Sequence, residues 1–164
     1  MIQITAVKQD SDIELIAQLA KEIWTHHYTP IIGIDQVNYM LEKFQSESSI
    51  KSQLANGYEY HLLKFDDRPA GYIAFCYKDG HLFLSKIYVH ANFRGKGIGK
   101  AAMCFMENEA QLNGFSKIRL TVNKYNSNSI LAYEKMGFET ITAIIQDIGN
   151  GYVMDDYVLE KKLN

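Results

Sequence analysis

The stretch Arg94-Gly95-Lys96-Gly97-Ile98-Gly99-Lys100-Ala101 decides how the rest of the chain is interpreted. It follows an apolar run at 82–89 and begins a helical pattern. Glycine lets the backbone approach a ligand closely, and a helix N-terminus carries roughly half a positive charge. A strand that turns into a helix through such a loop is typical of a phosphate site built from backbone amides. A basic surface turn is the alternative, because short glycine patterns also arise by chance.

The elements on both sides of this loop favour the phosphate site. Residues 82–89 are apolar enough for a buried strand, and apolar residues then recur at three- and four-residue spacing, which predicts a helix. The members of this stripe are Ile98, Ala101, Ala102, Phe105, Met106 and Leu112. Asn113-Gly114 ends the pattern with a typical stop signal. We therefore expect a strand, a glycine-rich loop and a helix in succession.

Composition indicates one globular domain. The chain has 164 residues, of which 47% are hydrophobic, and this is enough for a sizeable core over residues 1–164. The net charge of −2 argues against nucleic acid as a partner. No secretory signal and no apolar run of about 18 residues is present, so we expect a soluble, cytoplasmic protein without a membrane partner. Cys76 and Cys104 both have apolar neighbours; we expect buried free thiols, and no metal or redox spacing.

The rest of the chain predicts a mixed sheet with helices on its faces. We expect strands at 1–7, 58–64, 68–77, 82–89, 117–122, 138–147 and 152–161, and helices at 34–44, 49–54, 98–112 and 126–136. A first helix should be capped by Asp10, Ser11 or Asp12 and should end before Pro30, near His26-His27-Tyr28. Asp66-Asp67, Asp79-Gly80 and Gly149-Asn150-Gly151 are expected hairpin turns.

Two stretches resemble the hallmarks of the GNAT superfamily of acyl-CoA-dependent N-acyltransferases. Arg94, Gly97 and Gly99 match its pyrophosphate-loop pattern, and 126–138 resembles its Asn-led helix that ends in Tyr-Glu-Lys-x-Gly-Phe. The matching positions of this second hallmark are Asn126, Ser129, Ile130, Tyr133, Gly137 and Phe138. The resemblance covers essentially the whole chain. It implies a mixed α/β (α+β) fold, with a mostly antiparallel sheet of about seven strands flanked by four or so helices, as a single N-acetyltransferase domain.

The resemblance also implies roles for individual residues. Acetyl-CoA would be the co-substrate, with no metal. Its pyrophosphate would bind the loop amides of Arg94, Gly95, Lys96, Gly97, Ile98, Gly99 and Lys100, and its pantetheine arm the strand edge at Ile87, Tyr88 and Val89. Asn126 would contact CoA, and Tyr133 would be the general acid that protonates the departing thiolate. The plainer alternatives are that Asn126 only caps its helix and that Tyr133 only packs.

The acceptor site is less well marked. Many relatives use a glutamate as the base on the strand before the loop, but Ser85 and Lys86 occupy those positions here. His90 is nearby, with a structural role as its alternative. Acceptor contacts are expected from Trp24, His27, Tyr28 and Asp155, and the adjacent Asp156 and Tyr157 could also attract a cationic amine. Packing, capping or solvated charges would explain the same residues.

Three functions follow from these patterns. The first is N-acetylation of a primary amine, either on a small, polyamine-like molecule or on a peptide. Dimers are common in the family, so the resemblance also admits a homodimer. The second is a non-catalytic CoA-binding sensor or interaction module of the same fold. The third, a nucleotide-phosphate site, is disfavoured because the loop lacks the Gly-Lys-Ser/Thr ending of a P-loop.

Overall fold

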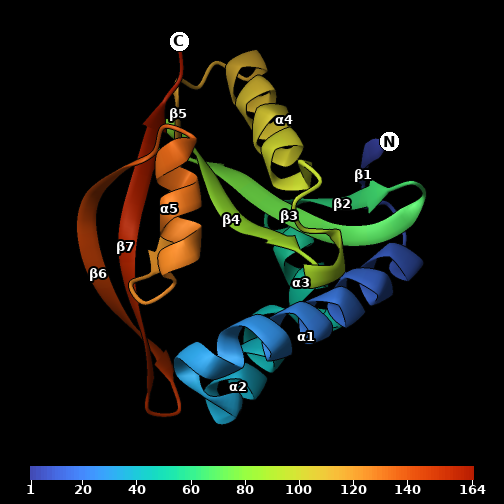
Figure 1. Cartoon of the computed structure of the whole chain (residues 1–164), viewed down its shortest axis with the longest axis vertical. Helices are drawn as coiled ribbons and strands as arrows, with labels where there is room; N and C mark the ends of the chain where they lie inside the picture. Colours follow the sequence, from blue (N-terminus) through green and yellow to red (C-terminus); the bar gives the residue numbers. More distant parts are fainter.

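A seven-stranded sheet runs through the molecule in the order β1-β2-β3-β4-β5-β7-β6 (Figure 1). The computed structural model describes all 164 residues. Its strands are β1 (Ile2–Ala6), β2 (Glu59–Phe65), β3 (Arg68–Lys78), β4 (His81–Val89), β5 (Lys117–Asn123), β6 (Glu139–Gly149) and β7 (Tyr152–Lys162). Its helices are α1 (Asp10–Ile32), α2 (Ile34–Phe44), α3 (Glu47–Ala55), α4 (Ile98–Leu112) and α5 (Ser127–Lys135), with a 3₁₀ turn at Ala91–Phe93. This confirms the predicted mixed, mostly antiparallel fold.

Each face of the sheet carries its own hydrophobic core. Helices α1, α2 and α3 cover one face, and α4 and α5 cover the other. Successive residues of a strand point to opposite faces, and β3 follows this rule: Ile73 and Phe75 pack under α4, whereas Tyr72 and Ala74 pack under α1. The sheet is therefore buried on both sides along its centre. No helix is long and apolar enough to cross a membrane.

The sheet is divided at its only parallel pair. Strands β4 and β5 are paired solely where Leu82–Leu84 lies beside Ile118–Leu120. Ser85 then forms a bulge, because Leu84 and Lys86 pair with the adjacent β3 residues Phe75 and Ala74. Strand β4 stays paired with β3 as far as Val89, so its other edge has no strand neighbour over residues 85–89. An edge of unpaired backbone groups can accept an extended ligand.

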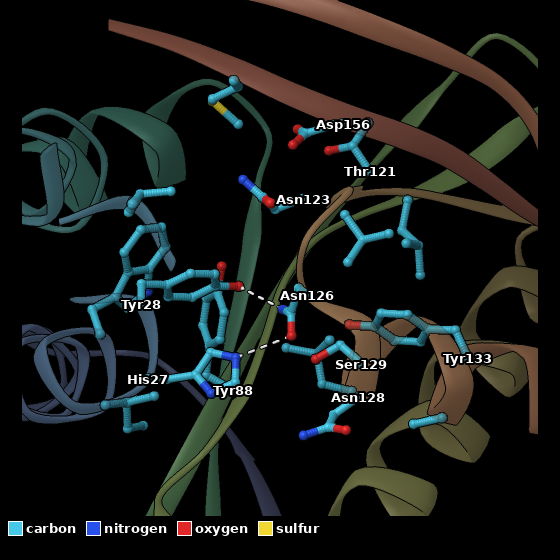
Figure 2. Close-up of a pocket in the computed structure, with 18 of the residues that line it drawn as sticks. His27, Tyr28, Tyr88, Thr121, Asn123, Asn126, Asn128, Ser129, Tyr133 and Asp156 are labelled. Atoms are coloured by element: carbon cyan, nitrogen blue, oxygen red, sulfur yellow. Dashed lines mark hydrogen bonds between the residues drawn. The ribbon is translucent and has the colours of Figure 1, made fainter. Parts of the chain in front are cut away.

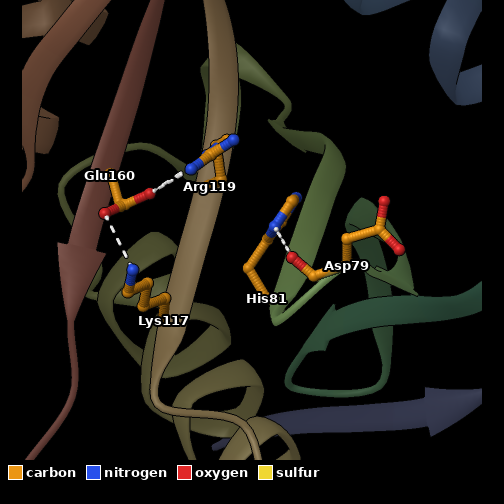
Figure 3. Close-up of polar contacts among 5 residues, drawn as sticks. All are labelled: Asp79, His81, Lys117, Arg119 and Glu160. Carbon is orange, nitrogen blue, oxygen red and sulfur yellow. Dashed lines mark hydrogen bonds and ion pairs between the residues drawn. The ribbon is translucent and has the colours of Figure 1, made fainter.

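Charged side chains join β5 to β7 at the opposite end of this division (Figure 3). Arg119 donates to the Glu160 carboxylate through Nη2 at 2.6 Å and through Nε at 3.0 Å, and Lys117 Nζ lies 3.9 Å from the same carboxylate. On β4, the His81 ring donates to the Asp79 carbonyl oxygen at 3.1 Å. These contacts join β5 to β7 and order the β3–β4 turn at the end of the sheet where β4 and β5 are paired.

The first helix differs from its prediction at both ends. Helix α1 continues through Pro30 to Ile32. The proline lies in the last turn, where its missing N–H removes a single bond, and the helix closes with the Gly33 N–H donating to the Thr29 carbonyl oxygen at 3.0 Å. Its N-cap is Gln9 rather than Asp10, Ser11 or Asp12, because the Asp12 carboxylate accepts the backbone N–H of Gln9 at 3.3 Å.

The prediction for one of the two thiols was wrong. Cys76 is buried as expected, but Cys104 is exposed on α4. The buried stripe of α4 runs through Ala102 and Met106. Cys104 is two residues from each, and two residues correspond to about 200° of rotation around a helix. Cys104 therefore faces away from the core.

Candidate active site

A cavity of about 450 Å³ lies where β4 and β5 separate (Figure 2). Residues from α1, β4, the loop after β4, β5, α5 and β7 surround it, so it draws together segments that are more than 100 residues apart. The polar and ionisable side chains that line it are His27, Tyr28, Gln36, Ser85, Tyr88, Arg94, Thr121, Asn123, Asn126, Asn128, Ser129, Tyr133 and Asp156. The cavity thus contains hydrogen-bond donors and acceptors together with imidazole, phenol and carboxyl groups, which can exchange protons.

The loop before α4 presents a row of unused amides. No backbone or side-chain acceptor takes a hydrogen bond from the amides of residues 95–100; Ala101, whose N–H donates to the Gly97 carbonyl oxygen at 3.0 Å, is the first to do so. Gly95 and Gly97 have φ of 78° and 79°, a left-handed conformation that other residues rarely adopt. Ile98 is 1% exposed and anchors the loop in the core. Arg94, Lys96 and Lys100 are exposed around these amides, a combination that suits a phosphate group.

Gly99 gives separate support for a ligand at this helix end. It lies in the first turn of α4 with an ordinary negative φ, and no protein atom lies within 4 Å of the position where a Cβ would stand. Neither backbone conformation nor packing therefore requires glycine here. A close approach by another molecule does explain it, and this location and chemistry fit the pyrophosphate of CoA.

The predicted strand-edge residues all line the cavity. Ile87 and Val89 direct their side chains to the core under α4, whereas Tyr88 packs among aromatic side chains on the α1 face. The ring centroid of Tyr88 lies 5.6 Å from that of Trp24 and 6.4 Å from that of Tyr28. With its side chains held on both faces, this segment turns its unpaired backbone edge towards β5.

Asn126 connects the two sides of the cavity. It occupies the N-cap position of α5 but makes no capping bond; its Oδ1 accepts from His27 Nε2 at 3.2 Å, and its Nδ2 donates to the Tyr28 hydroxyl at 3.4 Å (Figure 2). The side chain is buried, with 3% exposed. The capping alternative is therefore wrong, since Asn126 ties α5 to the C-terminal part of α1. Burial lowers the pKa of His27, so this imidazole is neutral at pH 7.

Tyr133 reaches into the cavity from α5 (Figure 2). Its ring packs against Phe138 at 5.8 Å between centroids, and its hydroxyl makes no hydrogen bond to a protein group. Burial raises the pKa of Tyr133 above its ordinary value of 10.0. The hydroxyl therefore keeps its proton at neutral pH and is available to donate it.

Of the two acidic residues considered for acceptor binding, Asp156 lines the cavity and Asp155 does not. Asp155 forms an ion pair with Lys124 at 2.7 Å and does not line the cavity. Asp156 lies opposite Asn123 across the β5–β7 pair and is 3% exposed. Consecutive strand residues face opposite sides, so a shift of one residue exchanges their roles. Alternation along β7 is the sequence signal that could have separated Asp156 from Asp155.

The other three candidates near β4 have different surroundings. Ser85, the bulged residue, lines the cavity. Lys86 points to the α2–α3 side, where its ammonium donates to the Phe44 carbonyl oxygen, to Gln53 and to the Tyr60 hydroxyl. His90 lies 3.3 Å from Glu22 and does not line the cavity, so its structural alternative holds.

A second cavity of about 470 Å³ adjoins the first on the α2 side of the sheet. The two share a set of lining residues at the β4–β5 gap, namely Trp24, Met40, Ser85, Tyr88, Thr121 and Met154. Lys86, Lys43 and Asp147 are the charged residues around the second cavity. The two cavities are therefore adjacent and are bordered by the same side chains at the β4–β5 gap.

Comparison of the sequence with known proteins identifies the family of this chain. Residues 16–138 match the Acetyltransferase (GNAT) family. A spermidine N(1)-acetyltransferase from Thermoplasma acidophilum is 23% identical over 156 residues, which is 92% of this chain and 91% of the relative. An uncharacterized N-acetyltransferase from Lactobacillus delbrueckii subsp. lactis is 23% identical over 99% of this chain and 98% of its own. The chain belongs to the GNAT family of acetyltransferases.

Solved structures agree with the fold. The PaiA N-acetyltransferase from Thermoplasma acidophilum, determined in complex with coenzyme A, superposes with a TM-score of 0.81 at 22% identity and covers 99% of both chains. The ribosomal-protein-S18-alanine N-acetyltransferase from Escherichia coli superposes with a TM-score of 0.71 at 18% identity, over 100% of this chain and 95% of that one. At these identities the likeness establishes the shared fold, and it leaves the acceptor to be argued from the site.

Proposed function

We propose that this chain transfers an acetyl group from acetyl-CoA to a primary amine of a small, polyamine-like molecule, with Tyr133 as the general acid. The observation that carries the proposal is the row of unused amides at 95–100, which directly follows Arg94 in the lining of a cavity bordered by an unpaired strand edge and by Tyr133. The relative named as a spermidine acetyltransferase, together with cavities of small-molecule size, favours a small amine over a peptide.

Binding follows from the groups in place. The loop amides and the N-terminus of α4 hold the pyrophosphate, with Arg94, Lys96 and Lys100 adding positive charge. The edge of β4 at 87–89 pairs with the amides of the pantetheine arm as a further strand would. The thioester then lies in the gap between β4 and β5. The acceptor enters from the second cavity, on the α1–α2 side.

The chemistry is a direct attack of the amine on the thioester carbonyl. An alkyl amine with a pKa near ~10.4 must first lose a proton, which costs roughly 4–5 kcal/mol at pH 7. As the new C–N bond forms, the C–S bond breaks and its electron pair goes to sulfur. The Tyr133 hydroxyl supplies the proton that converts this thiolate to a thiol.

An acceptor screen with acetyl-CoA tests the proposal. Release of the CoA thiol is measured with polyamines, aminoglycosides, amino acids and peptides with a free N-terminus as acceptors. Binding of acetyl-CoA and of desulfo-CoA is measured separately by calorimetry. We expect binding of both coenzymes and the fastest release with polyamines. Tight binding without release for any amine would instead identify a CoA-binding module, which the lack of a β4 carboxylate at Ser85 and Lys86 favours. No binding of either coenzyme would refute both functions.

Replacing Tyr133 separates acid catalysis from binding. Tyr133→Phe keeps the ring packed against Phe138 and removes only the hydroxyl, which no protein group uses. We expect a fall in kcat of about a hundredfold or more, the usual contribution of general acid catalysis, with unchanged affinity for desulfo-CoA by calorimetry. The exposed Tyr125 offers a matched control, since Tyr125→Phe should behave as the wild type. Undiminished turnover in Tyr133→Phe would remove this residue from the acid role.

A further inference from the structure

We propose that Asp156 binds the ammonium group of the acceptor and takes up its proton. This inference rests on the proposed function and supplies the base that β4 lacks. In the register of the sheet, Asp156 of β7 lies opposite Asn123 of β5. Cross-strand partners point to the same face of a sheet, and Figure 2 shows the Asp156 carboxylate beside Thr121 at the edge of the cavity.

Asp156 is the only carboxylate that lines the first cavity. It is 3% exposed, and no side chain or backbone group donates a hydrogen bond to its carboxylate. A buried, ionised carboxylate without a partner is strongly disfavoured. A cationic ligand supplies both the opposite charge and the missing donors. The site therefore selects an amine that arrives as an ammonium ion.

The other ionisable groups around the cavity are unsuited to this role. Tyr28 and Tyr133 are held protonated by burial, and the neutral His27, whose Nε2 donates to Asn126, carries no negative charge that could attract an ammonium ion. Arg94 is a permanent cation beside the CoA loop. In the adjoining cavity, the Lys86 ammonium already has three acceptors. This leaves Asp156 on the β7 side as the base and Tyr133 on the α5 side as the acid.

The immediate charges around Asp156 tune its protonation. Burial, with a smaller contribution from the Asp155 carboxylate, raises the pKa of Asp156 to about 6, and the Lys124 ammonium opposes this shift. At pH 7 the carboxylate is mostly ionised and can accept a proton. At pH 5 it is mostly protonated and cannot, so the activity of this site should fall on the acid side.

The proposed reaction balances with these two residues. The ammonium gives one proton to Asp156 and becomes the free amine, whose lone pair forms the C–N bond to the thioester carbonyl carbon. The C–S bond breaks, sulfur takes its electron pair, and Tyr133 protonates it. The second proton of the former amine, now on the amide nitrogen, returns to the Tyr133 phenolate through water. Asp156 releases its proton to solvent, so one proton is produced for each acetyl group transferred.

The pH profile of kcat/KM for a diamine tests the assignment, with Asp156→Asn as the main variant. The wild type should lose activity below an apparent pKa near that of Asp156, about 6. Asp156→Asn should lose about a hundredfold in kcat/KM or more. The remaining activity of this variant should no longer show the fall at low pH (the acid limb of the profile). Unchanged binding of desulfo-CoA and an unchanged melting temperature show that the variant is folded.

Two neighbouring substitutions provide directional controls. Asp155→Asn removes a negative charge and should move the acid limb to lower pH; Lys124→Met removes a positive charge and should move it to higher pH. Both should keep the maximal rate of the wild type. A structural role for Asp156 would not produce opposite shifts. Wild-type kcat/KM and an unchanged acid limb in Asp156→Asn would overturn the inference.

A binding measurement keeps this test separate from the proposed function. Calorimetry with 1,4-diaminobutane, in the presence of desulfo-CoA, should show at least tenfold weaker binding to Asp156→Asn than to the wild type. If the wild type acetylates no amine but this loss of binding is observed, the proposed function fails and the ammonium site stands. Equal binding of the diamine by both proteins would overturn the ammonium site itself.

Discussion

At the scale of single residues, Lys86 shows how a charge is held inside this protein. It follows the β4 bulge, is 5% exposed, and its ammonium donates to the Phe44 carbonyl oxygen at 2.6 Å, to Gln53 Oε1 at 3.1 Å and to the Tyr60 hydroxyl. An ammonium has three protons, and three acceptors surround this one. Burial nevertheless lowers the pKa of Lys86 to about 7, because water solvates the charge better than these groups do.

The lowered pKa predicts a stability that rises with pH. Between pH 7 and the ordinary lysine value of 10.5, the unfolded chain binds the proton more strongly than the folded one, so raising the pH favours the folded state. From pH 7 to pH 9 this should add on the order of 2 kcal/mol to the free energy of unfolding. Urea titrations should show this gain in the wild type and its loss in Lys86→Met. Lys21→Met, at an exposed position of α1, should retain it; a gain retained by Lys86→Met would contradict the assignment to Lys86.

At the scale of elements, the start of α4 has features that lower helix stability but suit a ligand site. A glycine within a helix costs up to about 1 kcal/mol relative to alanine, and at Gly99 no strained φ or close contact accounts for its use. The amides ahead of it are likewise left without partners. These features are explained together if this end of α4 binds CoA.

Gly99→Leu should therefore change stability and binding in opposite directions. A leucine in the first turn of α4 should raise the free energy of unfolding by a few tenths of a kcal/mol up to about 1 kcal/mol. Its side chain would occupy the approach to the loop amides, so the Kd for desulfo-CoA should rise at least tenfold in calorimetry. Asn108→Ala, on the exposed face of the same helix, should stabilise without changing the Kd. Tight CoA binding by Gly99→Leu would place the pyrophosphate elsewhere.

At the scale of the whole molecule, the cavity joins the two halves of a divided sheet. Strands β1 to β4 lie on one side of the β4–β5 gap, and β5, β7 and β6 lie on the other. Away from the short Leu82–Leu84 pairing, the Asn126 bonds to His27 and Tyr28 connect α5 to α1 across the gap. A ligand that fills the gap contacts both halves and should stabilise them as a unit.

CoA should accordingly stabilise the entire fold. At a free concentration a hundredfold above its Kd, a ligand that binds only the folded state adds about 2.7 kcal/mol to the free energy of unfolding. Hydrogen exchange should slow most at the amides of 95–100, which have no partner, and at those amides of 85–89 that face β5 rather than β3. ATP at equal concentration serves as the control and should give neither effect. Equal stabilisation by ATP would favour a nucleotide site over a CoA site.

Local features of the sequence predicted the seven strands and their order, the turns and the two family motifs. A glycine loop, an Asn-led helix and alternating strands are each defined by residues that are close in the chain, so their patterns can be read without knowing the fold. The predictions that failed depended on surroundings. Helix α1 continues beyond Pro30 because its last turn packs and is closed by a backbone hydrogen bond. Cys104 is exposed because its position around α4 faces away from the core. Strand register placed Asp156, rather than its neighbour Asp155, at the cavity.

The sequence by itself thus determined the family, the fold class and the loop that starts α4. Only the tertiary structure decided which side chains share the cavity: Asn126 with His27 and Tyr28, and Tyr133 with Asp156. The physical reason is that a strand residue one position away points to the opposite face of the sheet. Which face is buried, and which lines a gap, depends on strands and helices that are distant in the sequence.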